Sequence, residues 1–215
     1  MIKFIKNLIF LIAILGMASH INGNTSRYDE TLKHLKEREG FTAFGYLPTT
    51  SSGVTIGIGI DLGQQTKAGL QSKGVSLAII SKLEKYLGYK SKAQLDAAKL
   101  TASNLVLTIT EAELLSKPFI LESYNAVAPY AVNLDSKGNA VLVSLRHWAG
   151  SLGCSNCKLS VLVNGIDTNY LWTAIKGKTA TNAQIKQALE KTLPGKLPIG
   201  SATYNRIKHE ITYLG

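Results

Sequence analysis

The feature that most constrains the fold of this chain is a run of alternating residues over Gly53–Gly63. Apolar side chains occupy every second position of this run: Val54, Ile56, Ile58 and Ile60. A period of two predicts a β-strand that buries one face in the core. The opposite face then carries small or polar residues: Thr55, Gly57, Gly59 and Asp61. Because two glycines leave gaps between a hydroxyl and a carboxylate, another molecule can approach the backbone closely on this face.

A helix that ends in a second carboxylate precedes this strand. Tyr28, Leu32 and Leu35 recur at helical spacing, and four positions further the same stripe reaches Glu39. Gly40 suits the end of the helix. Glu39 is therefore expected to point towards the core, where partial burial and the negative end of the helix dipole favour a protonated carboxyl group, as a general acid requires. The alternative is a glutamate that merely ends a helix at the surface.

The remaining pattern predicts one more strand and a series of helices. Residues 41–47 predict a strand that joins the central strand through a turn over 48–53, which makes a hairpin. Helices are expected over 64–73, 76–87, 91–100, 110–133, 139–148, 167–176, 181–191 and 201–213. Pro118 is expected to break the fourth of these helices, and Arg206, Lys208 and Glu210 are expected at the exposed rim of the last. The fold class is therefore α+β, with a mainly helical lobe and a small antiparallel β-hairpin lobe.

The N-terminal residues 1–23 have the pattern of a signal peptide. Lys3 and Lys6 form a basic start, an apolar run follows, and small residues suit cleavage. The folded domain then covers residues 24–215, and the protein is periplasmic or secreted. An uncleaved anchor in the inner membrane is the alternative, although the apolar run is short for a spanning helix. After removal of the signal we expect no stable membrane insertion.

The chain is basic, with a net charge of +10 that falls to +8 when Lys3 and Lys6 are removed. A basic balance favours anionic partners, which include nucleic acid, membrane surfaces and cell-wall polymers. Export argues against nucleic acid. Charge and export together therefore favour a polymer of the cell envelope or of the extracellular space.

Two cysteines, Cys154 and Cys157, lie three positions apart. This spacing fits a redox pair, half of a zinc site or a small disulfide loop. The sequence has no second cysteine pair, and only His147 is near, which disfavours zinc. We expect neither a metal nor another cofactor. In an oxidising compartment the disulfide is the preferred interpretation.

Three parts of the sequence resemble the active-site region of the phage-type lysozymes: Glu39-Gly40, Tyr46 and Thr55-Ile-Gly-Ile-Gly59. Phage lysozymes carry a catalytic aspartate just after the tyrosine, whereas Leu47-Pro48 follow Tyr46 here. Instead, Asp61 follows the strand within Thr-Ile-Gly-Ile-Gly-Ile-Asp-Leu-Gly-Gln, which is similar to the pesticin branch of the same superfamily. A weaker resemblance covers residues 144–150 and the final helix.

The resemblance implies a lysozyme-like fold and a muramidase that cleaves peptidoglycan between N-acetylmuramic acid and N-acetylglucosamine. In this interpretation Glu39 is the general acid, Asp61 is the second carboxylate, and Thr55 helps to hold the water. Tyr46 contributes to substrate binding. The resemblance further implies inversion at the anomeric carbon, and it leaves room for an immunity protein as a second partner.

This assignment makes a geometric demand on the central strand. In a straight strand Thr55 and Asp61 would lie roughly 20 Å apart, at about 3.3 Å per residue, and could not share one water. The chain must therefore bend sharply at Gly57 or Gly59, which glycine permits.

Other interpretations stay open at this point. Asp61 can be a turn or helix-cap residue, and Thr55 an ordinary strand residue. The whole domain can be a cell-wall-binding module of the same fold without turnover. Cys154 with His147 can act instead as a peptidoglycan amidase pair.

Overall fold

A computed structural model describes residues 27–150, 152, 170–193 and 201–215. The chain divides into two compact units: unit 1 comprises Met1–His34 and Val127–Gly215, and unit 2 comprises Leu35–Ala126. The first described helix covers residues 27–39, so its C-terminal part from Leu35 onward belongs to unit 2. The predicted signal peptide and both cysteines lie outside the described residues, and these assignments stay predictions.

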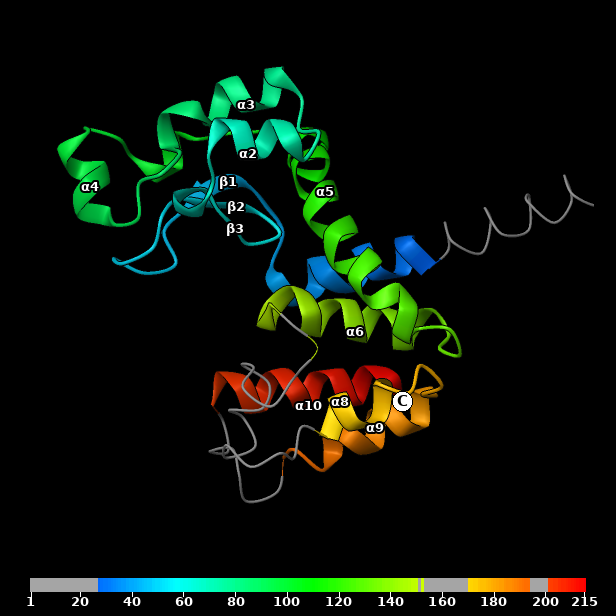
Figure 1. The fold of residues 1–215 in the computed structure, drawn as a ribbon. Coiled ribbons are helices and arrows are strands. Elements are labelled where there is room, and N and C mark those ends of the chain that lie inside the picture. Colours follow the sequence, from blue (N-terminus) through cyan, green and yellow to red (C-terminus); the bar gives the residue numbers. More distant parts are fainter. Residues whose placement is uncertain (1–26, 151, 153–169, 194–200) are drawn as a thin grey trace, which may run out of the picture. The chain divides into compact units, whose positions relative to one another are not determined.

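Unit 2 contains a three-stranded antiparallel sheet in the order β1-β2-β3 (Figure 1). The strands are β1 (Thr42–Tyr46), β2 (Thr55–Gly57) and β3 (Ile60–Asp61). The prediction of one continuous central strand is wrong, because the chain turns between β2 and β3. The predicted bend is present: Gly57 and Gly59 both adopt positive φ, +67° and +87°. Such backbone angles favour glycine over any residue with a Cβ.

The apolar positions of this segment are buried as the period of two predicts. Val54, Ile56 and Ile58 are fully buried and Ile60 is 4% exposed. Ile56 lies directly opposite Ile60, so the two side chains share the core face of the sheet. The burial pattern therefore continues through the turn.

Helices and short 3-10 turns complete unit 2. In chain order they are η1 (Leu62–Gln64), α2 (Lys67–Ser72), α3 (Leu77–Leu83), η2 (Glu84–Tyr86), α4 (Lys92–Ala97), η3 (Ala102–Asn104) and α5 (Ile109–Val127). Side chains of Thr66, Ser76 and Ser91 cap α2, α3 and α4 by accepting backbone hydrogen bonds. Helices α2 and α3 pack together, as Figure 1 shows.

Helix α5 differs from the prediction at two points. It runs unbroken through Pro118, and its capping box pairs Thr108 with Glu111 rather than Thr110 with Glu113. Leu115 and Ile120, on either side of the proline, are fully buried. Their packing outweighs the backbone hydrogen bond that proline removes.

Unit 1 is helical in its described residues. It comprises η4 (Ala128–Tyr130), α6 (Ser136–Ala149), α8 (Tyr170–Ile175), α9 (Asn182–Glu190) and α10 (Ala202–Leu214). Helices α6, α9 and α10 pack on one another, and α8 packs on α9 (Figure 1). The predicted capping box of Thr181 with Gln184 is present, and Gly150 ends α6 in a left-handed conformation.

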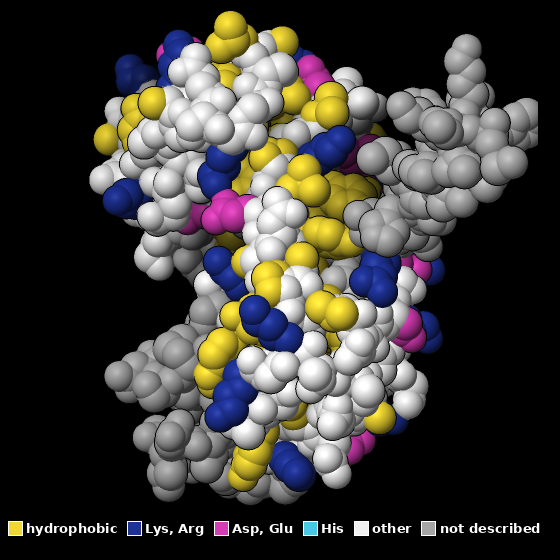
Figure 2. Space-filling model, turned by 45° about the vertical axis from the view of Figure 1, so that its right-hand side comes forward, with side chains coloured by type: hydrophobic (Ala, Val, Ile, Leu, Met, Phe, Trp, Pro, Cys, Tyr) yellow, Lys and Arg dark blue, Asp and Glu magenta, His cyan; other side chains and the backbone are white. Residues whose placement is uncertain are grey.

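Mainly helical structure with a small antiparallel sheet confirms the α+β fold class. Lys and Arg side chains are scattered across the face drawn in Figure 2, in keeping with the net charge of +10. Within the described ranges, no helix has both the length and the apolar character that crossing a membrane requires.

Candidate active site

Three side chains form a row across one face of the sheet in unit 2. Tyr46 on β1 lies directly opposite Thr55 on β2, and Thr55 lies directly opposite Asp61 on β3. Directly opposed residues in antiparallel strands project to the same face, with Cβ atoms about 5 Å apart. The turn at Gly57 and Gly59 thus brings Thr55 and Asp61 side by side, as is required if both residues hold the same water.

The carboxylate of Asp61 is held in one orientation by the backbone around it. Its Oδ1 accepts a hydrogen bond of 2.8 Å from the N–H of Gly63 and so caps η1. A Cβ added at Gly53 would lie 2.4 Å from the same Oδ1. Asp61 is therefore the cap residue that the simpler interpretation expects. This hydrogen bond engages Oδ1 only, so the capping role fixes the carboxylate and does not exclude a chemical one.

Thr55 lies in the middle of the row and is only 3% exposed. Its hydroxyl donates to the carbonyl oxygen of Gly53 at 3.5 Å. A hydrogen bond of this length is weak. The hydroxyl can therefore turn towards a better partner on the sheet face.

Glu39 ends the helix that precedes β1. It is the last residue of the first helix, is half-buried, and its Oε1 is shielded from solvent. Gly40 follows with a φ of +69° and ends the helix as predicted. Burial, and next the negative charge of Glu39, raise the pKa of the Tyr46 phenol. The charge of Glu39 therefore acts on Tyr46, the β1 member of the row.

The row has the components of acid–base chemistry. One carboxyl group acts on Tyr46, another is Asp61, and a hydroxyl lies between Tyr46 and Asp61. Two carboxyl groups that flank a bond can protonate a leaving oxygen and activate a water, respectively. All four residues belong to unit 2, so this arrangement forms within one compact part of the chain.

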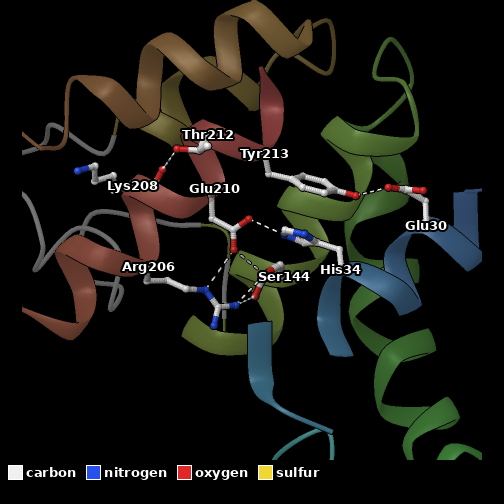
Figure 3. Close-up of polar contacts among 8 residues, drawn as sticks. All are labelled: Glu30, His34, Ser144, Arg206, Lys208, Glu210, Thr212 and Tyr213. Atoms are coloured by element: carbon white, nitrogen blue, oxygen red, sulfur yellow. Dashed lines mark hydrogen bonds and ion pairs between the residues drawn. The ribbon is translucent and has the colours of Figure 1, made fainter. Parts of the chain in front are cut away.

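A second polar cluster, shown in Figure 3, is buried in unit 1. His34 Nε2 lies 2.6 Å from Glu210 Oε2, and both side chains are fully buried. Ser144 Oγ donates to Glu210 Oε1 at 2.7 Å. Arg206 contacts the same Oε1 at 3.2 Å and donates to Ser144 Oγ at 2.7 Å. The prediction that Arg206 and Glu210 lie at an exposed rim is wrong, because these groups satisfy one another inside the unit.

The contacts of this cluster compensate for the burial of its charged groups. Burial alone would raise the pKa of Glu210, but the hydrogen bonds and charges of His34, Ser144 and Arg206 together lower it. His34 contacts the carboxylate rather than the serine, so the cluster lacks the serine–histidine pairing that activates a nucleophile. His34 also stacks on Tyr213, with ring centroids 3.9 Å apart.

The structure does not test the pairing of the other sequence candidates. Cys154 lies outside the described residues, so its pairing with His147 is not placed. Among the residues that the structure describes, no group of three or more His, Cys, Asp and Glu side chains is arranged to hold a metal ion. Phe44, for which the sequence pattern predicts no role, lies on the same exposed side of β1 as Tyr46 and is 60% exposed. The alternation within Thr42–Tyr46 is the signal that reveals it.

Comparison with protein families gives one match. The Pesticin family, described as a bacterial toxin homologue of phage lysozyme, C-terminal, matches residues 29–154. No curated protein matches the chain significantly. The matched range includes the whole row with Glu39, and the 144–150 segment, but not α10. Since it covers more than half of the 215 residues, the chain belongs to the Pesticin family and is a lysozyme-type glycoside hydrolase that degrades peptidoglycan.

Proposed function

We propose that this protein is an exported muramidase that cleaves peptidoglycan between N-acetylmuramic acid and N-acetylglucosamine. In this proposal Glu39 is the general acid, and Asp61 and Thr55 position the attacking water. The observation that carries the proposal is the direct pairing of Thr55 with Asp61 across β2 and β3. Because the chain turns between β2 and β3, the hydroxyl of Thr55 and the carboxylate of Asp61 can contact the same water.

In the proposed reaction Glu39 acts as the acid and Asp61 as the base. Glu39 donates its proton to the glycosidic oxygen as the bond breaks, and Asp61 accepts a proton from the water that attacks the anomeric carbon. The Gly63 N–H holds one oxygen of Asp61, which leaves the other to meet the water. We propose inversion, which requires the two carboxyl groups to lie about 6.5–9.5 Å apart so that a water fits between them.

Tyr46 is proposed to bind the substrate. The ordinary pKa of a tyrosine is 10.0 and burial raises that of Tyr46 further, so its phenol is protonated at neutral pH and can donate a hydrogen bond to a sugar oxygen. The residue is 39% exposed and can also contact the sugar.

Export and partners follow from the sequence. Residues 1–23 are proposed to direct the chain to the periplasm or outside the cell. The basic charge of the remainder favours association with the anionic cell wall. We also propose an immunity protein as a partner in the producing cell, because the same bond occurs in that cell's own wall.

The test is digestion of purified sacculi with mass analysis of the products. The expected products are muropeptides with new reducing ends, and Glu39→Gln should abolish their release while leaving binding and fold intact. Glu37→Gln is the matched control, because Glu37 lies on the same helix and is exposed. Binding without new reducing ends would select a non-catalytic module. Free amino groups whose release depends on Cys154 would select an amidase.

A further inference from the structure

The outer face of the sheet carries apolar surface beyond the polar row. Phe44 is 60% exposed and Val106 is 49% exposed. The two residues lie directly opposite each other in an isolated antiparallel bridge, so their side chains share one face. Pairing of β1 with β2 shifts register between Thr42 and Tyr46. Within β1, exposed Phe44 and Tyr46 still alternate with buried Ala43 and Gly45, so the two exposed side chains lie on the same side of the strand.

Local contacts hold this apolar surface in place. The N–H of Gly45 donates to the carbonyl oxygen of Leu105 at 2.8 Å, and the N–H of Leu107 donates to the carbonyl oxygen of Ala43 at 2.9 Å. Val106 therefore lies along the edge of β1 that does not pair with β2. The hydroxyl of Thr42 accepts a hydrogen bond of 3.0 Å from the N–H of Phe44. Phe44 therefore lies in an irregular part of β1 that is held by the bridge to Val106 and by the hydroxyl of Thr42.

We propose that Phe44, supported by Val106, is a stacking platform for a sugar of the glycan strand next to the bond that is cleaved. A pyranose ring presents apolar C–H groups on its faces, and a planar aromatic ring matches such a face. The platform is continuous with Tyr46 and hence with the row of Thr55 and Asp61, which is the argument for glycan as the occupant. The inference rests on the proposed function and specifies how the same site binds the glycan strand.

The experiment compares substitutions of Phe44 in two assays. Kinetics on soluble glycan strands separates KM from kcat, and a second assay measures sacculus binding by the inactive Glu39→Gln protein. We expect Phe44→Ala to raise KM and weaken binding about fivefold, with kcat little changed. Phe44→Trp should retain both, because it keeps a planar ring, whereas Phe44→Leu should behave like Phe44→Ala.

Leu77→Ala is the matched control, because Leu77 is 63% exposed in the same unit and lies outside the sheet face. Unchanged KM and binding in Phe44→Ala would overturn the platform, as would a Phe44→Leu protein as good as wild type, or an equal effect of Leu77→Ala. Melting temperatures separate these outcomes from misfolding. The binding assay needs no turnover, so failure of the platform is distinguishable from failure of the muramidase assignment.

Discussion

Replacing Gly53 by alanine should disable the site through Asp61. A Cβ at this position would lie 2.4 Å from Asp61 Oδ1, 2.5 Å from the nitrogen of Gly63 and 2.6 Å from the carbonyl oxygen of Tyr89. Two of these atoms belong to the backbone and cannot turn away. The added methyl group must therefore push the Asp61 carboxylate off the Gly63 N–H and separate the two segments.

The size of the effect follows from these contacts. Overpacking of a tight site costs about 1–3 kcal/mol, and loss of a cap hydrogen bond costs about 1 kcal/mol. The free energy of unfolding should thus fall by about 2–4 kcal/mol. A displacement of Asp61 by about 1 Å should reduce the release of reducing ends from sacculi about 100-fold.

Gly74→Ala provides the control for stability. Gly74 has a φ of +80° and no atom within 4 Å of an added Cβ, so the substitution brings backbone strain of roughly 1–2 kcal/mol without a clash. Urea unfolding and the reducing-end assay should be run on both variants. Native activity in Gly53→Ala, or an equal loss of activity in Gly74→Ala, would refute the reasoning.

Three further predictions concern the sheet turn, Tyr46 and the buried cluster. Gly57→Ala should destabilise the protein, since its Cβ would lie 2.5 Å from Ser116 Oγ and its φ is +67°; adding Ser116→Ala should recover part of the unfolding free energy in a double-mutant cycle. Glu39→Gln should lower the pKa of Tyr46, because the charge of Glu39 is the second cause of its rise; ultraviolet titration against Tyr46→Phe measures this. Glu210 has a pKa below its ordinary value of 4.5, so the stabilisation that its carboxylate gives to the fold is present above pH 4.5 and is lost as the pH falls through the lowered pKa. Glu210→Gln should lower the free energy of unfolding by about 3–5 kcal/mol at neutral pH, and this free energy should then depend less on pH in acid, as urea unfolding measures.

The central segment shows what periodicity can and cannot predict. The buried face at Val54, Ile56 and Ile58 was readable because burial repeats every second residue. The turn between β2 and β3 was not visible in this pattern, because Ile58 stays buried within the turn itself. The bend followed instead from a chemical demand, namely that Thr55 and Asp61 meet, together with glycines that permit it.

The burial of Arg206 and Glu210 could not be predicted from the sequence, for a different reason. Whether a charged residue is buried depends on partners that the local pattern does not contain. Glu210 is buried because His34, which is 176 positions away in the chain, and Ser144 bond to it. Pro118 presents the same problem, since the packing that keeps α5 continuous comes from the tertiary structure.

The hairpin of β2 and β3 has a consequence for the order of events in refolding. Thr55 and Asp61 meet through a turn closed within one short segment, and such local pairs form within about microseconds in isolated hairpins. Glu39 reaches the sheet from a separate helix, across a greater sequence separation. The hydroxyl of Thr55 and the carboxylate of Asp61 should therefore be in register before Glu39 is in place, and the recovery of lytic activity should report the positioning of Glu39.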